Sequence, residues 1–428
     1  MGVPLDRTAP LGVADSTLLY ERLMSLTRAA VIVTAAAMPL YIVRFKVGPI
    51  PTTLLELLIL STIAIYAVAV LAGRAPLPAR TGFEIPVALL LVAGAAGVVV
   101  AADHRGALGI YRAYLVEPAA LFYVATAVFR DTASFKPLLA SVAGASILYS
   151  AVDLAYFLAA ALSGRIVPGH VAAAFSLNPN YVAMYLEPLI GVATGFVLFG
   201  NGRQRVLAAV ALLAMLPAEI ATFSRGGLVV LALLVLIVVV SYRSRILQAA
   251  TAIAAVVAGI VIWNLPVLGD RVRKVLQPEH GTVFNRLRIW TQTARMLGDH
   301  PLFGAGLNSY QQVMAPYRAG DPFSVPEPYP HNIALTSWTE LGLLGLVAFA
   351  WILTKLIVTP FLALTRANGL ERVVLWGTGT AFAMVAAHGL VDSPYWKNDL
   401  SVEFWLLAAL QVVALRAIAA RVPRGRSR

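Results

Sequence analysis

One polar segment separates two long apolar parts of this chain. Residues 264–331 read NLPVLGDRVRKVLQPEHGTVFNRLRIWTQTARMLGDHPLFGAGLNSYQQVMAPYRAGDPFSVPEPYPH, whereas long apolar runs make up the sequence on both sides. The segment holds three of the six histidines and a group of arginines: His280, His300, His331, Arg271, Arg273, Arg286, Arg288, Arg295 and Arg318. A membrane-embedded chain keeps its chemistry where polar groups gather. We therefore expect this segment, and the membrane edge beside it, to be the active region.

The composition indicates a membrane protein. Apolar residues make up 59% of the chain and charged residues 13%, whereas soluble domains average about 25% charged residues. The net charge of +12 does not indicate a nucleic-acid partner, because the basic residues form short clusters between the apolar runs and not one basic face. The absence of cysteine excludes disulfides, thiolate nucleophiles and cysteine–metal sites.

Run lengths predict an all-α integral membrane protein with about twelve transmembrane helices, because about 18 apolar residues suffice to cross the hydrocarbon core. One long external loop, containing an amphipathic helix, interrupts them. We expect the spans at residues 23–43, 52–72, 85–102, 107–129, 135–162, 181–199, 206–222, 227–240, 246–263, 333–362, 373–390 and 402–420.

The distribution of basic residues predicts the orientation of these spans. Cytoplasmic connections between spans carry more Lys and Arg than external connections. In this chain every second connection belongs to a set that is together richer in Lys and Arg than the short connections between them. The basic residues of these connections and of the C-terminal tail are Arg74, Arg80, Arg130, Lys136, Arg203, Arg205, Arg243, Arg245, Arg366, Arg372, Arg421, Arg424, Arg426 and Arg428. Both termini should then be cytoplasmic and the polar segment periplasmic. The chain divides into nine helices (1–263), a catalytic loop (264–331), and three helices with a basic cytoplasmic tail (332–428), all in the inner membrane.

Arg225 lies between two apolar runs, in the sequence TFSRGG (222–227). An arginine at this depth is costly unless it reaches the interface or faces a polar cavity, and the two glycines allow close approach of backbone or substrate. One interpretation is that Arg225 grips an anionic group, most naturally phosphate, through its planar fork. The other is an interfacial anchor with a polar neighbour.

A helix is predicted within the polar segment, over residues 282–297. At 100° per residue, its apolar residues fall on one stripe: Val283, Leu287, Trp290, Ala294 and Leu297. Arg286 flanks this stripe, while Arg288 and Arg295 point the opposite way, toward water. The periodicity prefers Arg286 over Arg288 as a ligand of a buried group. A stripe that only docks the loop, with a flanking salt bridge, is the alternative.

His331 follows Pro330 and precedes an apolar run, so it should lie near a helix N-terminus. The positive end of the helix dipole disfavours imidazolium, so we expect a neutral histidine that can accept a proton; a capping histidine is the alternative. His280 and His300 lie beside turn signals and have weaker claims. The histidines lack metal-ligand spacing, so we predict no metal site and no cofactor.

Three further polar residues are candidates for the same site. The sequence Asn178-Pro179-Asn180 breaks a helix, and Asn180 can line a cavity. Glu219 lies about two helical turns before Arg225 and can pair with a basic group there. Asp392 should lie on the outer side. Most other polar groups in the spans are expected to hydrogen-bond inside the bundle.

Several of these motifs, in order, resemble the O-antigen ligase and polymerase superfamily. They are NPNY (178–181), TFSRGG (222–227), NRLRIW (285–290), HPLFGAG (300–306), HN (331–332), ELGLLG (340–345) and HGLVD (388–392). The resemblance runs from about residue 178 to 392, and the earlier spans agree only in number and character. The usual Gly-Arg of the helix motif is Asn285-Arg286 here.

The resemblance implies a metal-independent glycosyltransferase of the C type whose donor is a glycan on undecaprenyl diphosphate. Arg225, Arg286 and His331 match the residues expected to be essential, Arg288 is a further candidate for diphosphate binding, and Asn332 shares the histidine motif. The two arginines would hold the diphosphate and stabilise its growing charge, and His331 would take the proton of the acceptor hydroxyl or orient that hydroxyl.

Three functions remain open from the sequence. The first is an O-antigen ligase, whose acceptor is a sugar of the lipid A core, and the second is a repeat-unit polymerase, whose acceptor is another lipid-linked glycan. The third is a transporter of lipid-linked sugars, which explains less well a long arginine-rich external loop, because carriers gather polar groups at the bilayer midplane. We expect the lipid bilayer and these glycolipids as partners, and no nucleic acid.

Overall fold

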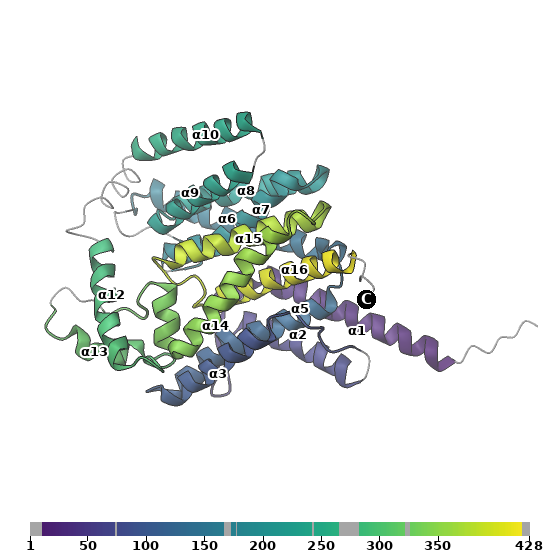
Figure 1. The fold of residues 1–428 in the computed structure, drawn as a ribbon, viewed down its shortest axis with the longest axis horizontal. Helices are drawn as coiled ribbons and strands as arrows, with labels where there is room; N and C mark the ends of the chain where they lie inside the picture. The colour runs from purple at the N-terminus through teal and green to yellow at the C-terminus, as the bar shows by residue number, and fades with distance from the viewer. Residues whose placement is uncertain are drawn as a thin grey trace, which may run out of the picture.

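The computed structural model describes residues 11–72, 75–166, 173–176, 178–241, 244–264, 282–321 and 326–421. Almost all of its regular structure is helical (Figure 1). The elements are α1 (Leu11–Ala36), η1 (Met38–Ile42), β1 (Arg44–Val47), β2 (Ile50–Thr53), α2 (Leu54–Leu71), α3 (Glu84–Val100), α4 (His104–Ile110), the π-helix η2 (Tyr111–Val116), α5 (Glu117–Val128), η3 (Ala133–Phe135), α6 (Lys136–Leu162), α7 (Pro179–Phe199), α8 (Gly202–Ala221), α9 (Arg225–Ser241), α10 (Arg245–Asn264), α12 (Thr282–Asp299), α13 (Tyr310–Arg318), α14 (Ile333–Ala363), α15 (Gly369–Gly389) and α16 (Asn398–Arg421).

Each predicted span coincides with a helix, and the span at 107–129 coincides with the continuous run α4–η2–α5. Within the described residues, six helical segments are long and apolar enough to cross a membrane: α2, η3 with α6, α7, α8, α14 and α16. Helices α3 and α9 are apolar but shorter. The protein is therefore all-α and carries membrane-spanning candidates, as predicted, while the full count of twelve crossings stays a prediction.

The long helices lie side by side in one bundle (Figure 1). Helices α12 and α13 lie at one end of the bundle, whereas α1 begins and α16 ends at the other. Helix α7 is central, since 83% of its apolar window is buried, against 28% for the η3–α6 segment at the periphery. Residues 265–281, which include His280, and residues 73–74, 242–243 and 422–428, which include several of the basic residues used for orientation, lie outside the described residues.

The segment after α12 docks into a break in α14. Gly342 interrupts this helix with φ 69° and ψ −175°, a conformation that only glycine adopts readily. The break frees backbone groups, and the N–H of Leu343 donates to the carbonyl of Leu302 at 3.0 Å. On the other side of the break, the N–H of Ala305 donates to the carbonyl of Thr339 at 2.7 Å. The HPLFGAG and ELGLLG motifs thus form one joint between the polar segment and α14.

Helices α12 and α13 pack on each other through a small core of their own. Met296 and Leu297 of α12 are buried against Tyr310 and Met314 of α13. Thr293 Oγ1 lies 2.7 Å from the hydroxyl of Tyr310, inside this contact. The two helices and the joint with α14 therefore hold α12 at a defined place beside the start of α14.

A short hairpin occurs where the sequence predicted only a connection between the first two spans. Strands β1 and β2 pair antiparallel, with Arg44 opposite Thr53 and Val47 opposite Ile50. The intervening Gly-Pro favours a turn. Thr53 then starts α2 with a capping box to Glu56.

Candidate active site

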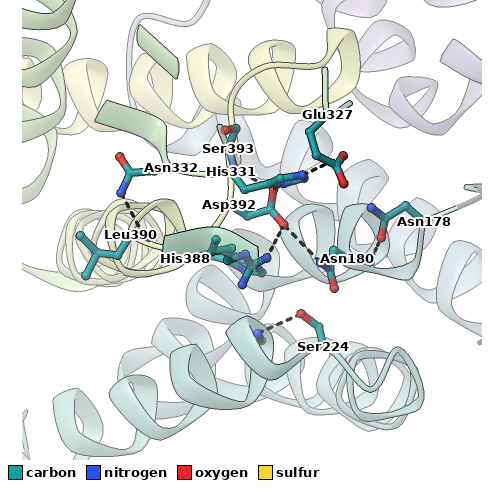
Figure 2. A network of polar contacts seen from close by, with 12 residues as sticks. Asn178, Asn180, Ser224, Glu327, His331, Asn332, His388, Leu390, Asp392 and Ser393 are labelled. Atoms are coloured by element: carbon teal, nitrogen blue, oxygen red, sulfur yellow. Dashed lines mark hydrogen bonds and ion pairs between the residues drawn. The ribbon is translucent and has the colours of Figure 1, made fainter. Parts of the chain in front are cut away.

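Asp392 is the centre of a polar cluster at the end of the bundle that carries α12. It lies between α15 and α16 and is buried. Its Oδ1 is 3.0 Å from Nδ1 of His331, and its Oδ2 accepts from Nδ2 of Asn180 at 3.2 Å and from Nη2 of Arg286 at 3.4 Å. Figure 2 shows Asn180 and His331 converging on this carboxylate from different segments. Four of the predicted site residues are thereby brought together.

The protonation of Asp392 follows from these contacts. Burial alone would raise the pKa of its carboxyl, but the hydrogen bond with His331 and the positive charges of His331 and Arg286 outweigh burial and lower the pKa to about 2. Asp392 is therefore an anion at neutral pH, and its negative charge balances the positive charges of His331 and Arg286.

His331 bridges two carboxylates. Its Nδ1 faces Asp392, and its Nε2 lies 3.2 Å from Oε2 of Glu327, as Figure 2 shows. Its φ is 51°, which is rare for a residue other than glycine and is found where surrounding contacts over-determine the backbone. The next residue, Asn332, caps α14 by accepting from the N–H groups of Ala334 and Leu335. His331 thus lies just outside the helix, with both ring nitrogens engaged.

The expectation of a neutral histidine was wrong for this arrangement. Burial lowers the pKa of His331, but the hydrogen bonds and charges of Asp392 and Glu327 outweigh burial and raise the pKa to about 9. Two carboxylates at hydrogen-bond distance act more strongly than the dipole of a helix that begins two residues later. The resting imidazole is therefore protonated at neutral pH.

Arg286 lies on the inward face of α12, as predicted. Its side chain is 15% exposed, and its Nε is buried without a hydrogen-bond partner among the described residues. Burial lowers the pKa of Arg286, Asp392 opposes that shift, and the charge of Arg225 adds to it. The two guanidinium groups are therefore within electrostatic range of each other, although their positions are 61 residues apart in the sequence.

The predicted apolar stripe of α12 was only partly right. Leu297 is buried and Trp290 is half-buried, but Leu287 and Ala294 are exposed. The inward face instead includes Gln292 and Thr293, both polar. Gln292 donates to Asp321, and Thr293 hydrogen-bonds with Tyr310, so both polar side chains have partners on the inward face. The spacing of apolar residues alone therefore predicts the inward face of α12 incorrectly.

Arg225 is the first residue of α9 and follows a strained turn. Phe223 has φ 53°, and the turn is fixed by hydroxyls: Thr222 Oγ1 accepts from the N–H of Ser224, and Ser224 Oγ accepts from the N–H of Gly227. Figure 2 shows Ser224 at this helix start, on the side that faces Asn180 and His388. In the part of the chain that the structure describes, the half-buried guanidinium of Arg225 has no hydrogen-bond or ion-pair partner.

A second histidine lies beneath the arginine-bearing turn. His388 Nδ1 is 2.7 Å from Oε1 of Glu187, and each of these side chains is only 1% exposed. Gly226 packs against the other ring edge, since a Cβ there would lie 2.6 Å from Nε2 of His388. Glu219 is buried nearby, and its carboxylate oxygens have no hydrogen-bond partner among the described residues, so the basic partner expected for it is not found there. Sequence reasoning did not place His388 at the site; the HGLVD motif was its only signal.

Gly226→Ala is expected to displace the turn that carries Arg225. The new Cβ would overlap His388, whose ring cannot move away because Glu187 holds it and protein surrounds it. Overpacking of this kind costs about 1–3 kcal/mol, so the thermal unfolding midpoint should fall. Gly144→Ala in α6 is the matched control, because nothing lies within 4 Å of a Cβ there. Equal midpoints for the two variants would contradict this account.

Three other predicted residues lie apart from the cluster around Asp392. Arg288 was predicted to face water. It is instead half-buried and paired with Asp321, to which its Nε donates at 3.1 Å. Asn332 caps α14 and donates its Nδ2 to the carbonyl of Leu390 at 3.0 Å, so its contacts are structural. His300 is exposed beyond the end of α12.

Glu327 contacts His331 but was not predicted as a site residue. It lies in none of the sequence motifs, so nothing in the sequence indicated it.

Comparison with known proteins bears on the same part of the chain. Residues 210–350 match the family model described as O-antigen ligase. The match includes Arg225, Arg286 and His331, while Asn180 and Asp392 lie outside it. No curated protein matches the chain. The match confirms the resemblance to the O-antigen ligase and polymerase superfamily, whose members are glycosyltransferase-like enzymes.

Proposed function

We propose that this protein is a metal-independent, inverting glycosyltransferase of the O-antigen ligase type. It moves a glycan from undecaprenyl diphosphate to a sugar hydroxyl of the lipid A core, at the periplasmic face of the inner membrane. The observation that carries the proposal is a pair of arginines with unused donors, Arg225 and Arg286, beside the contact between His331 and Asp392. The match to the O-antigen ligase family supports the same reaction class.

The arginines suit a diphosphate. Arg286 has one long contact to Asp392 and an unpartnered Nε, and Arg225 has no partner among the described residues. Two guanidinium groups that repel each other are stabilised together by an anion with several oxygens, and each can form paired hydrogen bonds to phosphate. Negative charge grows on the diphosphate as the glycosidic bond breaks, so fixed cations stabilise the transition state more than the ground state.

His331 and Asp392 suit the proton transfer. The acceptor oxygen attacks the anomeric carbon, the new C–O bond forms, and the old C–O bond breaks with its electron pair leaving on undecaprenyl diphosphate. The hydroxyl proton passes to Nε2 of His331, while Asp392 holds Nδ1. For this the imidazolium must first lose its Nε2 proton to solvent, and the acceptor hydroxyl must then replace Glu327 at Nε2. Loss of that carboxylate returns the pKa of His331 toward its ordinary value.

The acceptor decides between the ligase and the polymerase. The cluster around Asp392 concerns the donor diphosphate and the proton, which both reactions share. The family match covers both reactions, so the ligase is proposed first and the choice of acceptor tests it against the polymerase. The position of these residues argues against a transporter. Carriers place their polar groups near the bilayer midplane, whereas the histidine–carboxylate pair and the two arginines with free donors lie at one end of the bundle.

The test is transfer by the purified protein in detergent with a chelator present. We expect glycan from an undecaprenyl-diphosphate donor to appear on a lipid A core acceptor, and the product to have the inverted anomeric configuration by NMR. Growth of the glycan on the lipid donor without a core acceptor would replace the ligase by the polymerase. No product with either acceptor, from protein that remains folded and binds the donor, would overturn the glycosyltransferase.

A further inference from the structure

A separate cavity of about 380 Å³ lies between α6, α7 and α8, away from the cluster around Asp392. It begins where α6 and α8 begin and is lined there by Lys136, Arg203 and Gln204. Its remaining lining is apolar and includes Leu370 of α15, apart from Ser146, whose hydroxyl already donates to the carbonyl of Val142. The proposed reaction has no role for this cavity.

The polar end of the cavity is positively charged. Lys136 and Arg203 are exposed, and neither has an ion-pair partner among the described residues. The cavity's described lining includes no carboxylate. Asn201, which precedes α8, makes no side-chain capping bond, so the first N–H groups of this helix also face that end. The arrangement fits one anionic head group with an apolar tail.

The length and volume of the cavity suit one lipid chain in one leaflet. Its lining runs along α8 from Arg203 to Met215, about 18 Å at ~1.5 Å per residue. Half of a hydrocarbon core is about 15 Å deep. A volume of about 380 Å³ holds roughly a dozen groups of the size of a methylene or a water molecule, which is close to one acyl chain.

We propose that this cavity binds an anionic glycerophospholipid of the leaflet opposite the active site. The phosphate lies between Lys136 and Arg203, and one acyl chain fills the space between α6, α7 and α8. The site keeps these peripheral helices packed on central α7, which carries Asn180 at its other end.

The position of the cationic residues argues against the polyprenyl donor as the occupant. Helix α8 leads from Arg203 at the cavity to the turn before Arg225, about 30 Å away at ~1.5 Å per residue. A donor whose diphosphate is held by Arg225 has its head group at that far end. Its tail could reach the apolar lining but would leave Lys136 and Arg203 without an anion.

Native mass spectrometry of the full-length protein, delipidated in detergent and titrated with phosphatidylglycerol or phosphatidylcholine, tests the proposal. We expect one phosphatidylglycerol to bind more tightly than phosphatidylcholine. The double variant Lys136→Ala/Arg203→Ala should weaken phosphatidylglycerol binding about 30-fold and remove the preference. The control Arg80→Ala/Arg366→Ala removes the same charge from other connections at the same end of the bundle, and should leave binding unchanged.

A second variant tests the apolar part independently of charge. Ala143→Phe fills the cavity from α6 and keeps both cationic residues, so it should abolish stoichiometric binding of either phospholipid. Unchanged phosphatidylglycerol affinity in the double variant, binding that survives Ala143→Phe, or tighter binding of undecaprenyl phosphate in competition would each overturn the proposal. These measurements need no glycan transfer, so their failure is separate from failure of the proposed reaction.

Discussion

Arg225→Ala is expected to lower glycan transfer by roughly 10²–10³-fold, the range for loss of one fixed donor to a developing anion. Arg225 has no protein partner within the described residues, so its removal leaves no carboxylate unpaired and should change the unfolding midpoint little. The loss should appear in kcat as well as in kcat/KM, because the interaction strengthens as the diphosphate leaves. Transfer from a purified donor, at matched protein level, measures it.

The neighbouring arginines provide the comparison. Arg286→Ala should lose as much transfer as Arg225→Ala and also lower the unfolding midpoint, since it removes a partner of buried Asp392. Arg295→Ala, on the exposed face of the same helix, should transfer normally. Arg225→Lys should keep only part of the activity, because an ammonium cannot form the paired contacts of a guanidinium. Near-normal transfer by Arg225→Ala would remove this residue from the mechanism.

Asp392→Asn is expected to lower transfer by about 10²–10⁴-fold, the range for loss of general base catalysis. The amide cannot balance Arg286 and cannot stabilise the His331 imidazolium that forms when the acceptor loses its proton. It is also expected to destabilise the fold, because a buried carboxylate with several hydrogen bonds is replaced by a neutral group. Circular dichroism and unfolding midpoints separate loss of fold from loss of chemistry.

Glu327→Gln is the matched variant, because it removes the other carboxylate from the same imidazole and leaves Asp392 in place. In the wild type, the raised pKa keeps His331 protonated up to about pH 9, so at pH 7 only about one ring in a hundred is neutral. The wild-type kcat/KM should therefore rise with pH through about 9. Glu327→Gln removes one cause of the raised pKa, so this rise should move to lower pH. A profile identical to that of the wild type would contradict the role of His331 as the base.

The positions of the helices were predictable because each depends on local composition. All twelve predicted spans coincide with helices, since an apolar run can satisfy its backbone groups only within itself. The inward position of Arg286 was also predictable, from helical periodicity alone. The same periodicity failed for Leu287 and Ala294, because it could not anticipate that Gln292 and Thr293 find partners across the contact with α13.

The residues of the candidate active site were predictable in part. Arg225, Arg286 and His331 stand out in the sequence as polar groups beside apolar runs or in family motifs. The protonation state of His331 could not be read from the sequence. It is set by Glu327 and Asp392, and these two carboxylates become neighbours of the imidazole only in the folded protein. His388 likewise becomes the support of the Gly226 turn through a contact between residues 162 positions apart.

Hydropathy and charge along the chain determine that this protein is a helical bundle with one polar segment, because the lengths of apolar runs and the spacing of basic residues are properties of neighbouring residues. The tertiary structure alone decides that Asp392 joins Asn180, Arg286 and His331, and that the imidazole carries a proton. Electrostatic and hydrogen-bond energies depend on distances of a few ångströms, and those distances arise only when helices from separate parts of the chain pack together.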